Sequence, residues 1–220
     1  MVTSIISVKD IAEIEKQFSQ NYYNGNITSD NYFDTIGGYG NILLSAPHSV
    51  NHWRDNRVKV SDLYTGTIIK ILSTMTNSPA IFMTKFMEGD KIIDNYFLEL
   101  KNIVSALNIR LVIDIHGMKE RENIDIDIGT GLDYKFIPKN IVDKTVCIFK
   151  SNGILNPTVG AVFNANNPYT ISYKVHENLN ILSCQLEISK KYRDPINGNK
   201  EFLQMVNVLH NLIKEISLIL

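Results

Sequence analysis

Three short segments of the sequence carry side chains of the kinds that bind metal ions and transfer protons. His48 follows one apolar run, Asp114 and His116 end a second, and Glu187 lies in a third. Neutral imidazoles with a carboxylate are common ligands of catalytic zinc, which keeps one position open for water. A further carboxylate nearby serves as general base and acid in hydrolysis. These residue types indicate a hydrolase with one zinc ion.

Asp114 and His116 are two residues apart in the segment 110–117. In a strand, side chains at this spacing point to the same face. The competing interpretation is that the two residues only pair with each other, because structural ion pairs also occur at strand ends. Gly117 follows, where the chain either turns sharply or lets a ligand approach the backbone.

The elements that must position these residues follow from the hydrophobic pattern. Apolar and β-branched runs predict strands, and a polar stretch at 51–59 predicts a loop over the strand ends. Segment 122–129 alternates isoleucine with polar residues, which predicts a half-buried strand with one polar face. The predicted strands are 41–46, 79–84, 110–117, 122–129, 159–163, 169–175 and 182–188.

Apolar residues at helical spacing predict helices between and after these strands. Ser61 is the expected N-cap of one helix, with Asp62 in its first turn. The predicted helices are 8–22, 61–76, 90–107, 140–152 and 202–220. Helices that alternate with strands favour a single α/β domain over residues 1–220, a three-layer α/β/α fold with a central mixed sheet. Residues 1–40 form an N-terminal helix and turn extension in this prediction.

Composition excludes several classes of partner. The 220 residues carry a net charge of -1, without a basic tract that would attract nucleic acid or an anionic membrane. Cys147 and Cys184 lack the spacing of a zinc or redox pair and are expected to be buried thiols in a reducing compartment. The sequence has no evident signal peptide and no apolar run of membrane-spanning length, so a cytoplasmic protein is expected. The oligomeric state is left open.

Five motifs appear in one order along the chain: Ser45-Ala-Pro-His-Ser49, Arg57-x-Lys59-x-x-Asp62, Asp114-Ile-His-Gly117, Asp125-Ile-Asp-Ile-Gly129, and Gln185-Leu-Glu-Ile-Ser189 with Arg193. Together they resemble the N-formylglutamate amidohydrolase family over about residues 40–195. The resemblance implies a phosphorylase/hydrolase-like α/β fold, related to that of the zinc carboxypeptidases.

The resemblance also implies roles for individual residues. His48 and His116 would be zinc ligands, and Glu187 would be the general base. Zinc carboxypeptidases carry a glutamate ligand three residues after the first histidine, where this chain has Asn51. The third ligand must come from elsewhere, and Asp62 is the expected residue, with Asp55 as its competitor.

The expected substrate is a small molecule with a carboxylate, which requires cationic partners. Family members have an arginine-containing segment before the last strand, whereas the comparable segment here, 167–173, has none. Arg57 and Arg121 are therefore the candidates for substrate binding, and Arg193 is a candidate catalytic residue beside Glu187.

The sequence thus predicts a zinc-dependent amidohydrolase that cleaves an amide bond in an N-acyl amino acid or small peptide-like substrate. Two alternatives remain open at this stage. One is a metal-dependent hydrolase of γ-glutamyl or ester substrates. The other is a binding protein of the same fold without catalysis, which the absent His-x-x-Glu pair and the absent arginine leave open.

Overall fold

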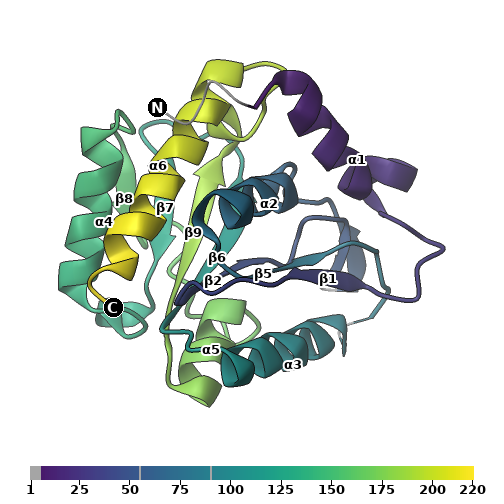
Figure 1. The fold of residues 1–220 in the computed structure, drawn as a ribbon, viewed down its shortest axis with the longest axis horizontal. Coiled ribbons are helices and arrows are strands. Elements are labelled where there is room, and N and C mark those ends of the chain that lie inside the picture. The colour runs from purple at the N-terminus through teal and green to yellow at the C-terminus, as the bar shows by residue number, and fades with distance from the viewer. Residues whose placement is uncertain (1–5, 55, 90) are drawn as a thin grey trace.

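A computed structural model describes residues 6–54, 56–89 and 91–220, except the side chains of residues 91 and 92. The described residues form a seven-stranded sheet with helices on both faces (Figure 1). The strands, in spatial order, are β1 (Phe33–Ile36), β5 (Ala80–Met83), β2 (Ile42–Ala46), β6 (Leu111–Met118), β9 (Leu182–Ser189), β7 (Ile126–Gly129) and β8 (Pro157–Val159).

The sheet is mixed, as predicted. Strands β5, β2, β6 and β9 are parallel neighbours in its centre. Strand β1 is antiparallel to β5 at one edge, and β7 is antiparallel to β9 on the other side. Because the carboxyl ends of β2, β6 and β9 lie next to one another, residues that follow these strands meet at one edge of the sheet.

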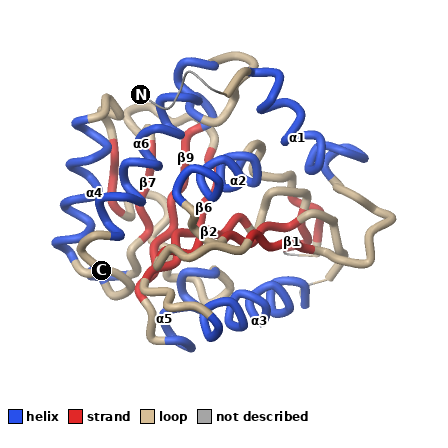
Figure 2. Tube along the Cα trace, viewed as in Figure 1, coloured by secondary structure: helices blue, strands red, loops and turns tan. Residues whose placement is uncertain are grey.

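Helices form a layer on each face of the sheet (Figures 1 and 2). One layer holds α1 (Val8–Tyr23), α2 (Thr65–Thr76), α4 (Lys139–Ser151) and α6 (Asn199–Ser217), and the other holds α3 (Lys91–Ala106) and α5 (Ile171–Leu179). This arrangement confirms the predicted three-layer α/β/α fold. Helix α2 packs against α1, α6 and strands β2, β5 and β6, so it links the N-terminal helix to the sheet.

The central strands are buried on both faces, which explains their apolar composition. Every residue of β2 is buried, and in β6 only Gly117 is partly exposed. Asp114 lies in the middle of β6 with no exposed surface. A carboxylate in such a position requires hydrogen-bond partners, and these partners belong to the site described below.

Segment 169–175 is a helix rather than the predicted strand. Its alternating tyrosine, isoleucine and valine residues suggested a strand, but α5 begins at Ile171 after an N-cap at Thr170. The Thr170 hydroxyl accepts a hydrogen bond from the backbone N–H of Tyr173. The buried residues Ile171 and Val175 are four apart, on one helical stripe, and this packing outweighs the β propensity of the side chains.

Two further predictions, both for segments near the candidate site, differ from the structure. Helix α2 begins at Thr65, not at Ser61, so Asp62 lies in a turn before the helix. The expected loop at 51–59 is a hairpin of β3 (His52–Arg54) and β4 (Arg57–Lys59).

Cys147 is also exposed, contrary to expectation, while Cys184 is buried as expected. In the part of the chain that the structure describes, no helix combines the length and the apolar character that crossing a bilayer requires.

Candidate active site

The carboxyl ends of three adjacent parallel strands carry the candidate catalytic residues. His48 follows β2, His116 lies near the end of β6, and Glu187 lies near the end of β9. His116 and Glu187 are direct register partners on neighbouring strands. Side chains of register partners project from the same face of a sheet, so the fold brings Glu187 beside His116.

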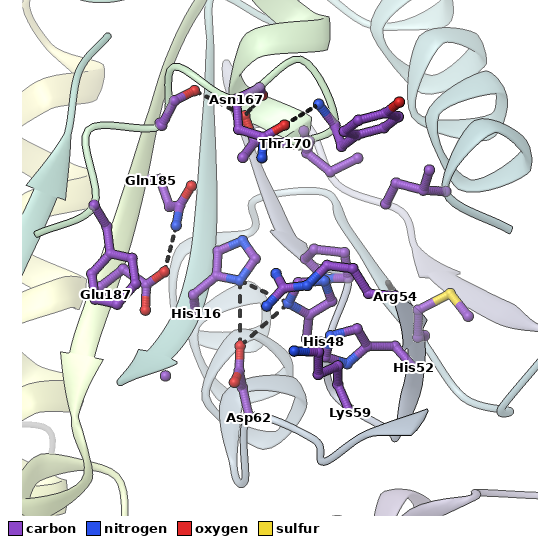
Figure 3. Close-up of a pocket in the computed structure, with 18 of the residues that line it drawn as sticks. His48, His52, Arg54, Lys59, Asp62, His116, Asn167, Thr170, Gln185 and Glu187 are labelled. Carbon is purple, nitrogen blue, oxygen red and sulfur yellow. Dashed lines mark hydrogen bonds and ion pairs between the residues drawn. The ribbon is translucent and has the colours of Figure 1, made fainter. Parts of the chain in front are cut away.

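Three donor atoms converge at this edge (Figure 3). His48 Nδ1 and His116 Nδ1 are 3.1 Å apart, and the Asp62 Oδ2 atom is 3.3 Å from His116 Nδ1 and 3.5 Å from His48 Nδ1. Tetrahedral zinc with bonds of about 2.05 Å separates its ligand atoms by about 3.3 Å. The triangle therefore fits one face of a zinc coordination tetrahedron and leaves the fourth position free.

The turn before α2 places Asp62. The backbone N–H of Asp62 donates to the His48 carbonyl at 2.8 Å, and the Asp62 carbonyl accepts from the Thr65 hydroxyl. These bonds hold the carboxylate-bearing turn against the loop that carries the first histidine. Asp55, the competing ligand, lies outside the described residues.

Asn51, which stands where zinc carboxypeptidases have a glutamate ligand, has another function here. Its side-chain N–H groups donate to the Tyr22 carbonyl and to Asn24 Oδ1, and its Oδ1 accepts from the Ser61 backbone. The side chain thus ties the end of α1 to the residue before Asp62. These three hydrogen bonds direct the Asn51 side chain toward the end of α1 and Ser61, and Asp62 provides the carboxylate at the site.

A buried hydrogen-bond chain orients His116. Asp114 Oδ2 lies 2.8 Å from His116 Nε2, so Nδ1 is the ring nitrogen turned toward His48 and Asp62. Asp114 Oδ1 accepts from the Ser45 hydroxyl, which lies 3.0 Å from the Tyr96 hydroxyl. Metal-ligating histidines commonly bond a carboxylate through their second nitrogen in this way. The Asp114–His116 pair therefore matches the environment of a metal ligand.

The charges of the cluster also suit a cation. Burial opposes the charged form of Asp62, but its hydrogen bonds with His116 and His48 outweigh burial and hold the Asp62 pKa well below its usual value. Burial also opposes charge on His116, yet Asp114 and Asp62 raise its pKa well above normal. Both shifts reflect the negative charge that Asp114 and Asp62 place around His116, and the same negative charge favours a bound cation.

Glu187 is buried beside this cluster, with 6% of its surface exposed. Burial raises the pKa of Glu187, against the effect of nearby His116. Its Oε1 accepts a hydrogen bond from the Gln185 amide. A buried carboxyl with a raised pKa beside candidate metal ligands is a candidate general base.

His52 lies on the far side of His48 from Glu187 (Figure 3). Its ring stacks on that of His48, with centroids 3.8 Å apart and an interplanar angle of 7°. Burial, and then the neighbouring His48, lower the pKa of His52 to about 2. A neutral ring packed on His48 restricts the orientation of that imidazole.

A cavity of about 800 Å³ opens over the cluster. The β3–β4 hairpin forms one wall, and the loop 162–171 forms another. Among the described residues that line the cavity, Arg54 and Lys59 are the cationic ones, and Trp53 and Phe163 add aromatic surface. The cavity thus combines the acidic and imidazole cluster with a cationic wall.

The predicted arginines are placed differently. Arg57 and Arg121 are exposed, and neither belongs to the described lining of the cavity. Arg121 instead lies over the ring of Phe163, with the guanidinium carbon 5.7 Å from the ring centroid. The sequence analysis missed Arg54, because the hairpin that turns it toward the cavity was predicted as a loop.

Arg193 is not among the residues that line the cavity. It is 6% exposed and donates to three backbone carbonyls, those of Ile188 at 2.9 Å, Met118 at 3.2 Å, and Leu63. With its donors directed to the backbone, Arg193 is placed to support the strand ends rather than to contact a substrate.

The opposite wall has its own anchor, which the sequence analysis also missed. The buried Asp127 carboxylate accepts from the backbone N–H groups of Ala161, Val162 and Phe163, and from the Thr158 hydroxyl. On the polar face predicted for 122–129, Asp125 and Asp127 are buried, whereas Asn123 is exposed. Asp127 fixes the start of the loop that lines the cavity.

The fold and this cluster define a three-layer α/β/α protein with a candidate metal site at the carboxyl ends of parallel strands. No protein-family model matches the sequence, and no curated protein matches it either. Solved structures do share the fold, and they include enzymes that hydrolyse amide bonds.

The chain is similar in structure to N-formylglutamate amidohydrolase from Ralstonia eutropha JMP134, with a TM-score of 0.60 at 12% identity, covering 84% of this chain and 97% of the other. A bacteriophage poly-γ-glutamate hydrolase matches with a TM-score of 0.53 at 15% identity, covering 86% and 91%. Succinylglutamate desuccinylase from Vibrio parahaemolyticus matches with 0.52 at 15%, covering 84% and 62%. At these identities the similarity establishes the fold, as the resemblance of the motifs led us to expect.

Proposed function

We propose that this protein is a zinc-dependent amidohydrolase that cleaves an amide bond in an N-acyl amino acid or small peptide-like substrate. One observation carries the proposal: the donor atoms of His48, Asp62 and His116 form a triangle of zinc-ligand dimensions with Glu187 on the adjacent strand end. Solved structures of the same fold are consistent with this proposal, since two of them are named as an N-formylglutamate amidohydrolase and a poly-γ-glutamate hydrolase.

His48 Nδ1, His116 Nδ1 and a carboxylate oxygen of Asp62 would hold the ion, and the Asp114 carboxylate would keep the His116 ring in place. When bound, zinc supplies Lewis acidity, which makes water a stronger nucleophile near neutral pH and polarises a carbonyl. His52 limits the rotation of His48 through ring stacking.

Glu187 would act as the general base and then as the general acid. Its carboxylate takes a proton from the attacking water and passes it to the leaving nitrogen, which must be protonated for the amide bond to break. The burial that raises the Glu187 pKa makes its carboxylate a stronger base for the first of these proton transfers.

Arg54 and Lys59 would bind the substrate carboxylate in place of the predicted Arg57 and Arg121. Both line the cavity on the hairpin wall, and Figure 3 shows them beside His48 and His52. An arginine offers paired N–H donors that match a carboxylate. The cavity volume of about 800 Å³ suits a small acyl amino acid or a short peptide.

Metal analysis of the purified full-length protein is the direct test. Wild type should bind about one zinc per chain, as the cluster of His48, Asp62 and His116 requires, and His116→Ala should lose it. His210→Ala, a histidine on α6 away from the cluster, is the matched control and should retain zinc. Equal and near-zero metal content in wild type and His116→Ala would refute the proposal.

An activity panel separates the remaining substrate classes. It should contain N-formyl, N-acetyl and N-succinyl amino acids, γ-glutamyl peptides and amino-acid esters. Turnover of the N-acyl amino acids supports the proposal, whereas exclusive turnover of γ-glutamyl or ester compounds supports the alternative hydrolase. Zinc binding without any turnover would instead favour a binding protein.

A further inference from the structure

The peptide bond between Leu63 and Tyr64, which begins one residue after Asp62, is held at both ends by buried charged side chains. The Leu63 carbonyl accepts a hydrogen bond from Arg193 Nη1, and the Tyr64 N–H donates to Glu15 Oε1 at 3.2 Å. The carbonyl and the N–H belong to the same Leu63–Tyr64 peptide bond. A cation therefore faces the negative end of its dipole, and an anion faces the positive end.

Both charged groups are removed from solvent. Glu15 is 4% exposed and Arg193 is 6% exposed. The second oxygen of Glu15 accepts from the Thr67 hydroxyl at 2.6 Å, and its first oxygen also accepts from the Tyr23 hydroxyl at 3.0 Å. Buried charges are costly unless they are hydrogen-bonded, and here their partners include the turn itself and Thr67 in the helix that follows it.

The turn needs such support because its backbone is strained. Tyr64 has φ 66° and ψ 0°, the left-handed region that residues other than glycine rarely adopt. Such a conformation persists where surrounding contacts determine it. Arg193 and Glu15 provide those contacts on the two sides of the peptide bond.

Arg193 also connects this turn to the other two parts of the site. Its guanidinium donates to the Met118 carbonyl after His116 and to the Ile188 carbonyl after Glu187. It passes over Gly117, where an added Cβ would lie 2.2 Å from the guanidinium carbon. The glycine after His116 therefore leaves room for this side chain.

From these contacts we infer that Glu15 and Arg193 are positioning residues, which clamp the Leu63–Tyr64 peptide and thereby set the Asp62 carboxylate against His48 and His116. Arg193 additionally fixes the distance between the strand ends that carry His116 and Glu187. The N-terminal helix α1, which supplies Glu15, is accordingly part of the metal site. The inference rests on the proposed function in one respect, that Asp62 is a metal ligand.

Cobalt and zinc titration of Glu15→Gln and Arg193→Lys tests the inference. Gln keeps the shape of Glu15 without its charge, and Lys keeps the charge of Arg193 without a guanidinium that reaches three carbonyls. We expect metal affinity to fall by about tenfold to a hundredfold, the range found for residues that orient metal ligands. The visible absorption of bound Co²⁺, which reports ligand geometry, should also change.

Val142→Ala is the matched control, because Val142 is buried in α4, outside the cluster and the clamp. It should lower the melting temperature and leave metal affinity and the Co²⁺ spectrum unchanged. Should Glu15→Gln and Arg193→Lys fail to fold, Tyr23→Phe, which removes one hydrogen-bond donor to Glu15, replaces them, with a smaller loss of affinity expected. Wild-type affinity and spectrum in these variants would overturn the inference.

A crystal structure of Glu15→Gln separates this inference from the proposed function. If wild type takes up no metal, the zinc proposal fails, and the position of Asp62 then decides the inference. Displacement of its Oδ2 from the 3.3 Å separation to His116 Nδ1 would support the clamp. An unmoved carboxylate would overturn it.

Discussion

Asp114 Oδ2 lies 2.8 Å from His116 Nε2, two residues along the same buried strand. The two interpretations that the spacing allowed, a structural pair and a metal site, are therefore compatible in one geometry. The pair occupies one nitrogen of the ring and turns the other toward His48 and Asp62. The first prediction therefore concerns the effect of the Asp114–His116 pair on metal binding.

Asp114→Asn should weaken zinc binding by about tenfold to a hundredfold. The amide keeps the shape of the carboxylate, but it lacks the negative charge that orients and polarises His116. Titration against a competing chelator measures the affinity. Ser45→Ala, which removes only the hydroxyl donor to Asp114, serves as comparison and should have a smaller effect. An Asn variant that binds zinc like wild type would show that Asp114 is a structural residue alone.

Glu187→Gln should reduce turnover of the best panel substrate by about two to four orders of magnitude, the usual contribution of a general base. Zinc content should stay at the wild-type level, because Glu187 is not one of the three convergent donors. Steady-state kinetics and metal analysis on the same preparation give both quantities. The exposed Glu120 provides the control variant Glu120→Gln. Turnover by Glu187→Gln within a factor of about three of wild type would remove this residue from the chemistry.

Asp62→Ala should abolish stoichiometric zinc binding, and adding Asn51→Glu should not restore it. The side chain at position 51 is directed toward the end of α1 and the Ser61 backbone, so a glutamate placed there loses those bonds and points away from the histidines. Metal analysis of the single and double variants tests this. Zinc recovered in the double variant would mean that position 51 can supply the ligand after all.

The buried Glu15 should make stability depend on pH in a defined direction. Burial raises its pKa above the usual 4.5, although hydrogen bonds from Thr67, Tyr23 and Tyr64 oppose the shift. The folded protein then keeps the Glu15 proton to a higher pH than the unfolded chain does. The contribution of Glu15 to stability is therefore present at low pH and is lost as pH rises from 4.5 through the folded pKa.

Urea denaturation of wild type and Glu15→Gln between pH 4.5 and about pH 7 measures this contribution. The free energy of unfolding of wild type, minus that of the variant, should decrease across the interval. Val142→Ala, which removes no titratable group, should give a difference that stays constant with pH. A difference that rises with pH for Glu15→Gln would show that its carboxylate is stabilised, not penalised, by burial.

Much of the fold could be predicted because the apolar runs of β2, β6 and β9 match strands buried on both faces. The predictions that were wrong concern segments whose structure is decided by packing or by short-range geometry. Segment 169–175 carries a strand-like alternation, yet its buried residues share a helical stripe in α5. The strands of the β3–β4 hairpin have three residues each, too few for a periodic signal.

The candidate site also contains residues that the sequence pattern could identify and residues that it could not. His48, His116 and Glu187 could be proposed from the sequence because each follows or lies within an apolar strand, and the structure brings them to one edge of the sheet. Asp62 required the family resemblance, since no periodicity marks a turn. Arg54 could not be preferred to Arg57, because the orientation of either side chain depends on the unrecognised hairpin.

The hydrogen bond from the Asp62 N–H to the His48 carbonyl closes a loop in the chain, and the β3–β4 hairpin lies entirely within that loop. Two ligand-bearing segments are thus joined at the base, while the residues between them form a wall of the cavity. A hairpin of another sequence could join the same two points of attachment, provided that it keeps His52, whose ring stacks on that of His48. Under the proposed function, grafted hairpins that keep His52 would offer a route to change substrate preference while retaining the candidate metal ligands.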